Sequence, residues 1–137
     1  MILIDTNVLV FLFLRGERTE EARALFAADN DWRSDSFLLV EFSNVLSTYV
    51  RSRDLKIEQA TDLLEAAEKL MQTRLLNIPH AEALETANEF LVSAYDGRFL
   101  VLARRLNRRL VTEDAKLRRG APELTQSIRE ALRDLVR

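Results

Sequence analysis

The chain has 137 residues, of which 47% are hydrophobic and 31% charged, a balance that suits one compact domain with its own core. It contains no Cys and a single His, which excludes disulfides, zinc–thiolate sites and thiol nucleophiles and leaves oxygen atoms as the main ligands for any metal. The net charge of −2 argues against non-specific binding of nucleic acid over the whole surface.

The first predicted element is a buried strand, the short apolar run Ile2 to Ile4, which ends at Asp5. No basic segment precedes this run and no long apolar stretch follows it, so we expect neither a signal peptide nor a membrane span, and a cytoplasmic location. An apolar helix or tight turn follows over residues 6–14. The next helix is expected over residues 19–28, with Thr19 as its N-cap.

The rest of the chain alternates between short apolar runs and stretches with helical spacing. Strands are expected at residues 32–35, within 73–78, at 109–112 and, weakly, near Leu124. Helices are expected from a cap at Ser36 to about Arg53, and over 57–71, 80–92, 95–107, 114–119 and 127–137. This alternation is typical of a parallel sheet covered by helices on both faces, in which the functional crevice lies at the carboxyl ends of the strands.

Four carboxylates occupy positions near that crevice. Asp5 directly follows the first strand, and Asp114 closely follows the fourth. Glu41 flanks the apolar face of its helix, and Asp96 lies on the inward face at the start of another helix. Four converging carboxylates would repel one another unless a cation joined them. Oxygen ligands favour Mg²⁺ or Mn²⁺, whose chemistry is phosphoryl transfer by an activated water.

Each of these acids also has a purely structural interpretation. Asp5, Asp96 and Asp114 could cap the helices that follow them, and Glu41 could pair with a Lys or Arg. The segment from Arg98 to Arg119 holds eight basic and two acidic residues, a net charge of +6 against −8 for the remainder. That segment could face a phosphate backbone or could be a solvated helix surface.

Four segments of the chain carry a resemblance to a known family. They are ILIDTNVL at residues 2–9, VEFSNVL at 40–46, SAYDGRFL at 93–100 and LVTED at 110–114. In this order and spacing, up to about Leu117, they resemble the PIN-domain nucleases, and within that family the VapC-like toxins of bacterial toxin–antitoxin modules. Gly97 stands where the family more often has Ala, a difference expected to be harmless.

The resemblance implies one domain over residues 1–137, a three-layer α/β/α fold with a central, mainly parallel sheet of four or five strands. It implies an endoribonuclease that depends on Mg²⁺ or Mn²⁺, usually a homodimer, silenced by a small antitoxin protein. The helices at 19–28 and 36–53 are candidates for the antitoxin groove.

The same resemblance implies roles for individual residues. Asp5, Glu41, Asp96 and Asp114 match the catalytic acids, and Asp5, Asp96 and Asp114 match the metal ligands. Thr6 and Asn7 match positions that support the first acid, and Thr112 matches a hydroxyl residue that orients the last one. Arg15 and Arg98 are candidates for contact with a substrate phosphate.

Three alternatives compete with a toxin ribonuclease. A catalytically silent PIN module could hold RNA or protein, and a housekeeping nuclease could process RNA with the same acids. A phosphotransferase of haloacid-dehalogenase type would use the Asp after the first strand as its nucleophile. That enzyme needs a second Asp two residues later, where this chain has Asn7.

Overall fold

A computed structural model describes residues 1–136, which form eight helices and five strands. In chain order the elements are β1 (Ile2–Ile4), α1 (Thr6–Phe13), α2 (Thr19–Ala28), β2 (Trp32–Asp35), α3 (Leu38–Arg51), α4 (Ile57–Met71), β3 (Leu75–Leu76), α5 (His80–Phe90), α6 (Ala94–Leu106), β4 (Leu110–Val111), α7 (Ala115–Gly120), β5 (Thr125–Gln126) and α8 (Ile128–Leu135). Arg137, the last residue of the helix expected over 127–137, lies outside the described residues.

The five strands form one parallel sheet in the order β3-β2-β1-β4-β5. The predicted α/β class with a parallel central sheet is therefore confirmed. The weakly indicated last strand does form, because the backbone N–H of Leu110 donates to Leu124 O and that of Thr112 to Gln126 O, at 2.8 and 2.9 Å. From β1 in the middle of the sheet, β2 and β3 follow in chain order toward one edge, and β4 and β5 then follow toward the other edge. The strand order therefore reverses between β1 and β4.

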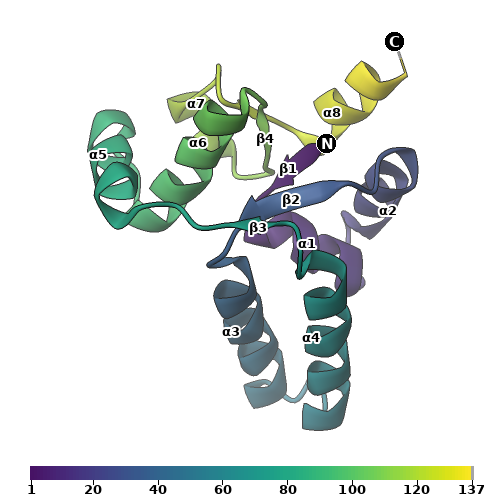
Figure 1. Ribbon diagram of the computed structural model, residues 1–137. Coiled ribbons are helices and arrows are strands. Elements are labelled where there is room, and N and C mark those ends of the chain that lie inside the picture. Colours follow the sequence, from purple (N-terminus) through teal and green to yellow (C-terminus); the bar gives the residue numbers. More distant parts are fainter. Residues whose placement is uncertain (137) are drawn as a thin grey trace.

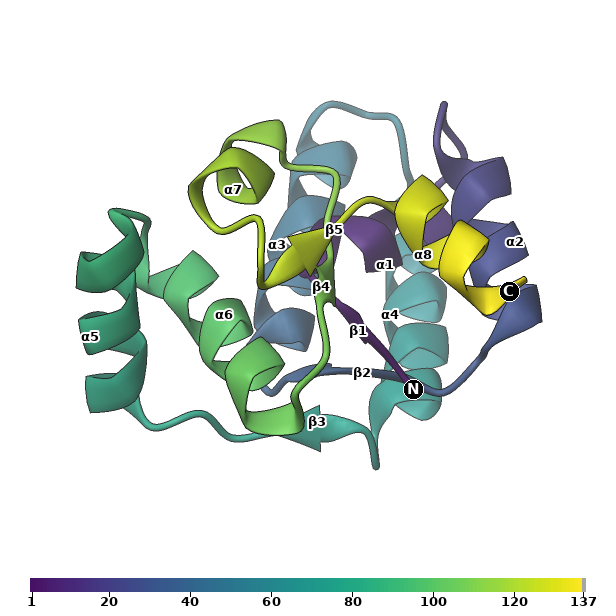
Figure 2. The same cartoon turned by 90° about the horizontal axis from the view of Figure 1, so that it is seen from above.

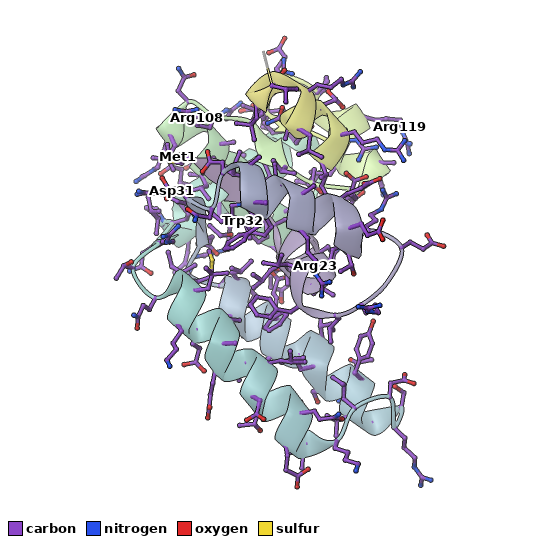
Figure 3. The ribbon with its side chains drawn as sticks, turned by 90° about the vertical axis from the view of Figure 1, so that its right-hand side faces the viewer. Met1, Arg23, Asp31, Trp32, Arg108 and Arg119 are labelled. Atoms are coloured by element: carbon purple, nitrogen blue, oxygen red, sulfur yellow. The ribbon has the colours of Figure 1, made fainter. Side chains whose placement is uncertain are left out.

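Helices cover both faces of the sheet. The pair α5 and α6 lies on one side of the strands, and α1, α2 and α4 lie on the other (Figure 2). The α3–α4 hairpin extends away from the sheet (Figure 1). All three residues of β1 are buried, as expected for a strand with helices on both faces. Trp32 of β2 is fully buried beneath α2, with its ring edge-on to Phe26 at 5.3 Å (Figure 3).

Two expected N-caps are wrong. Thr19 is the first residue of α2, and its hydroxyl accepts from Gly16 N–H and donates to Leu14 O, which closes the preceding turn instead. Ser36 does not cap α3 either. The preceding side chain, Asp35, accepts the N–H of Phe37 at 2.9 Å, so a buried carboxylate satisfies the start of this helix.

Gly97 lies where two helices are in close contact. Helices α5 and α6 approach so closely there that a Cβ atom on residue 97 would lie 2.5 Å from Ala83 O and 3.1 Å from the Cβ of Ala87. An alanine at this position is therefore not equivalent in this chain, because the backbone of α5 would have to move.

Among residues 1–136, no helix has both the length and the apolar character needed to cross a membrane.

Candidate active site

The register of the sheet brings polar residues to one edge. Leu3 pairs with Leu110 and Ile4 with Val111, so Asp5 follows β1 beside Thr112, which follows β4. On the other side Leu3 pairs with Arg33, so Asp5 also comes level with Asp35 at the end of β2. The reversal of strand order lies at the β1–β4 junction, where α/β sheets of this kind bind their ligands.

A cleft of about 520 Å³ opens at this edge. All four carboxylates singled out from the sequence line it, although they come from four segments far apart in the chain. The other lining residues are uncharged polar, aliphatic or aromatic side chains. The full lining is Asp5, Thr6, Asn7, Phe37, Val40, Glu41, Asn44, Val45, Tyr95, Asp96, Phe99 and Asp114.

Asp5 and Asp114 are both N-caps, as their structural interpretation proposed. Asp5 Oδ1 accepts the N–H of Val8, and Asp114 Oδ1 accepts the N–H of Leu117, both at 3.1 Å. The fully buried Thr112 hydroxyl accepts the N–H of Asp114 at 3.1 Å, which fixes the loop that carries this acid. Capping orients both side chains at the wall of the cleft, and because a carboxylate accepts several bonds it remains able to bind a cation.

Glu41 and Asp96 are presented by helices without capping them. Glu41 lies in the first turn of α3, and its Oε1 accepts the hydroxyl of Thr6 at 2.8 Å. The hydroxyl of Thr6 therefore supports Glu41, whereas the resemblance implied that Thr6 supports the first acid, Asp5. Asp96 is the third residue of α6, and its N–H donates to the true N-cap, Ser93 Oγ, at 3.1 Å. Its carboxylate is thus not required for the helix.

The electrostatics of the cleft disfavour the charged form of three of its carboxylates, Asp5, Glu41 and Asp96. Burial raises the pKa of Asp5 from 3.8 to about 6; Thr112 and the Val8 N–H oppose this shift, whereas Asp96 and Asp114 add to it. Burial likewise raises the pKa of Asp96, to which the charge of Asp114 contributes. Burial also raises the pKa of Glu41, although its bond from Thr6 opposes the change. In the absence of a bound cation, the site is under electrostatic strain.

No lining residue of the cleft, all of them within the described residues 1–136, is Lys, Arg or His. The carboxylates are not already clustered as ligands, since no three Asp, Glu or His side chains of the described chain are close enough to hold a metal ion. The donor set nevertheless fits a hard divalent cation, because it consists of carboxylate oxygens with hydroxyl and amide oxygens beside them.

Asp35 is a fifth carboxylate at this edge, which sequence reasoning missed. It is fully buried, and Arg98 binds it with two bonds, Nε to Oδ2 at 2.8 Å and Nη2 to Oδ1 at 2.9 Å. Arg98 is therefore committed to an internal ion pair, and its position gives no support to the expected contact with a substrate phosphate. Arg15 follows α1, is exposed and does not line the cleft. The signal that could have indicated Asp35 is its place at a strand end, the same signal that indicated Asp5.

The basic segment from Arg98 to Arg119 does not form one continuous surface. Half of its basic residues pair with acids of the fold: Arg98 with Asp35, Arg104 with Glu89, Arg105 with Glu82 and Arg118 with Glu113. Arg108 and Arg119 lie at opposite edges of the molecule in Figure 3. The interpretation as ordinary, solvated and paired helix residues fits this arrangement better than a single phosphate-binding face.

The fold and site together define an α/β/α domain with an acidic cleft where the strand order reverses. The family model of the PIN domain matches residues 2–121. The chain belongs to the PIN domain family, whose members are generally nucleases and typically use divalent metals.

Two solved structures are similar to this chain. The crystal structure of PAE2754 from Pyrobaculum aerophilum superposes with a TM-score of 0.78 at 19% identity, covering 98% of this chain and 96% of that one. The crystal structure of FitAcB from Neisseria gonorrhoeae gives a TM-score of 0.70 at 20% identity, with 93% and 98% covered. At such identities the likeness is one of fold. A comparison with curated protein sequences found no significant match.

Proposed function

We propose that this protein is an endoribonuclease that depends on Mg²⁺ or Mn²⁺ and acts as the toxin of a VapBC-type toxin–antitoxin pair. The observation that carries the proposal is the cleft itself: four carboxylates from four separate segments line one hollow, and no cationic side chain of the described residues lines it with them. Burial raises the pKa of three of these acids, Asp5, Glu41 and Asp96, and an external cation would offset that cost of their charged forms.

The residues of the cleft would divide the work. Asp5 and Asp96, with Asp114, would hold the cation, and Glu41 would help to hold it or position the attacking water. Thr6 orients Glu41 through its hydroxyl, and Thr112 fixes the segment before Asp114. When bound, the cation supplies the Lewis acidity that activates water and stabilises negative charge on the phosphate.

The proposed partners are an RNA substrate, a second copy of the chain and a small antitoxin. A groove of about 200 Å³ between α3 and α4, whose lining includes the apolar residues Leu46 and Ile57, supports the antitoxin part of the proposal. Ile57 is 60% exposed there. Of the two helices that the resemblance implied for the antitoxin groove, α3 forms one wall of this groove, and α4 forms the other.

The decisive experiment is an RNA cleavage assay with Mg²⁺, Mn²⁺ or EDTA that compares the wild type with Asp96→Asn. We expect cleavage by the wild type only with metal, and a loss of at least about a thousandfold in the variant, as for groups that act directly on the reacting centre. Asp62→Asn is the matched control, because Asp62 is an exposed acid on α4 outside the cleft.

Binding is measured in parallel as the rise in melting temperature on addition of Mn²⁺. Asp96→Asn should lose this rise, whereas Asp62→Asn should keep it. Unchanged cleavage by Asp96→Asn would refute the site assignment. Mn²⁺ binding without cleavage of any RNA would favour the silent binding module. Cleavage without growth arrest on expression would favour a housekeeping nuclease.

A further inference from the structure

An aromatic ridge borders the carboxylate cleft. It consists of Phe37, Val40 and Tyr95, and all three residues line both the cleft and a second hollow next to it. The rings of Phe37 and Tyr95 are stacked, with centroids 5.4 Å apart and planes inclined by 14°. Tyr95 is 58% exposed and Val40 is 56% exposed. A large aromatic ring presented to solvent directly beside a candidate active site requires an explanation.

The position of Tyr95 relates the ridge to the reaction. Tyr95 immediately precedes Asp96 on the first turn of α6, and Phe37 immediately precedes α3, which carries Glu41. The ridge is thus built from the same two helix starts that present two of the four acids. A group resting on Tyr95 would belong to the part of the substrate next to the phosphate held at the carboxylates.

The hollow on the far side of the ridge has the size and the polar groups to take a nucleobase. Its volume is about 560 Å³, and Ser36, His80 and Arg98 supply its polar lining. Arg98 Nη1 lies 3.2 Å from His80 Nδ1. An arginine nitrogen can only donate, so Nδ1 is the acceptor in this contact. Arg98, itself held by Asp35, thus holds the His80 ring at the rim of the hollow.

The arrangement favours RNA over other occupants. Aromatic rings stack on any base, and single-stranded RNA is recognised mainly through unstacked bases laid on aromatic side chains. A base in a duplex has no free face for Tyr95. Because Asp35 pairs with Arg98, none of the described residues that line the hollow offers an unpaired Lys or Arg to a phosphate, and the polar groups present suit the edge of a base.

We propose that the Phe37–Tyr95 ridge is a stacking platform for the nucleobase next to the cleaved phosphodiester bond, and that the second hollow receives the edge of that base. This inference rests on the proposed function. It makes Tyr95 a residue that binds substrate.

The first test uses a short RNA that spans a bond cleaved by the wild type, offered single-stranded or annealed to its complement. We expect cleavage of the single strand only. Tyr95→Ala should lower kcat/KM about 10- to 100-fold, mainly through KM, which is the range measured when a base-stacking ring is removed. Tyr95→Phe keeps the ring and should remain close to the wild type. Tyr49→Ala, which alters the chain's other tyrosine outside both hollows, should have no effect.

An abasic nucleotide on one side of the cleaved bond tests the contact directly. If that base rests on Tyr95, removing the base and removing the ring should each weaken cleavage, and the two changes combined should be no worse than either alone. Additive losses at both flanking nucleotides, or efficient cleavage of the duplex, would overturn the proposal. Additive losses accompanied by a change of sedimentation mass in Tyr95→Ala would instead make the ridge an interface between copies of the chain.

A binding measurement separates failure of the platform from failure of the proposed function. Asp96→Asn protein is titrated into oligouridylate RNA that contains one 2-aminopurine riboside, whose fluorescence falls on stacking. We expect Asp96→Asn to quench the fluorescence. The double variant Asp96→Asn with Tyr95→Ala should not quench it, and the double variant Asp96→Asn with Tyr95→Phe should. This outcome supports the platform even if the wild type proves to cleave no RNA. Equal quenching by all three proteins would overturn it.

Discussion

Two buried aspartates occupy equivalent positions on neighbouring strands of this molecule and differ in how their charge is met. Asp35 ends β2, is fully buried and receives three bonds, two from Arg98 and one from the N–H of Phe37. Asp5 follows β1, is 7% exposed, and caps α1 beside two further acids. The fold therefore supplies a counterion to one buried carboxylate and an uncharged N–H donor, that of Val8, to the other.

The difference separates an acid that is paired within the fold from one that is a candidate metal ligand. A carboxylate paired within the fold stabilises the position of its neighbours, here the starts of α3 and α6. A carboxylate without a counterion lowers the stability of the metal-free protein and gains affinity for a cation. Burial alone does not distinguish the two, since both are buried; the identity of the partner does.

The largest expected effect comes from breaking the internal pair. Arg98→Leu leaves Asp35 buried without a counterion, and we expect the free energy of unfolding to fall by about 3–5 kcal/mol. Urea denaturation measures this change. The double variant Asp35→Asn with Arg98→Leu should recover much of the loss, because the introduced amide carries no charge and its oxygen can still accept the Phe37 N–H. A loss below about 1 kcal/mol in the single variant would show that the pair is not structural.

Asp5→Asn should act in the opposite direction on the metal-free protein. The folded pKa of Asp5, about 6, lies above its ordinary value of 3.8, so the wild type loses stability as pH rises through that interval. The variant lacks this loss and keeps its cap through the amide oxygen. In EDTA at about pH 8 it should be more stable than the wild type by at most about 3 kcal/mol, and the difference should vanish below about pH 4.

Mn²⁺ should reverse that order, because the wild type gains stability from binding and Asp5→Asn does not. The measurement is chemical denaturation at several pH values with and without Mn²⁺. If Asp5→Asn were less stable than the wild type in EDTA at every pH, Asp5 would be a structural acid like Asp35.

Much of this comparison could be predicted from the sequence. Short apolar runs followed by acids indicated the strands and their functional edge, and the order of the four motifs indicated the family. Asp35 was not predicted as a site neighbour, because its partner Arg98 is 63 residues away and only the folded chain brings them together. Thr6 was assigned to the wrong acid for the same reason, since its bond reaches across to α3.

The need for glycine at residue 97 could not be predicted from the sequence, because a residue pattern contains no information on how closely two helices approach. Gly97→Ala should destabilise the protein by about 1–3 kcal/mol, as overpacking does, since the new Cβ would lie 2.5 Å from Ala83 O. It should also weaken Mn²⁺ binding, because Gly97 lies between Asp96 and Arg98 on α6. Gly120→Ala is the matched control, with its nearest contact at 4.0 Å, and should be neutral or slightly stabilising. Equal stability of both variants would show that α5 yields without cost.

The smallest expected effect separates positioning from stability most clearly. Ser93 Oγ caps α6 by accepting the N–H of Asp96, and Ser127 Oγ caps α8 by accepting the N–H of Glu130, both at 3.1 Å. Replacing either serine by alanine should cost about 1 kcal/mol of stability, the usual value for a lost N-cap. Only Ser93→Ala should also weaken Mn²⁺ binding, because the first turn of α6 carries a proposed metal ligand and that of α8 does not. If the two variants were to lose stability equally and bind Mn²⁺ equally, the cap of α6 would serve the helix alone and the position of Asp96 would be set by the packing of α6 against α5.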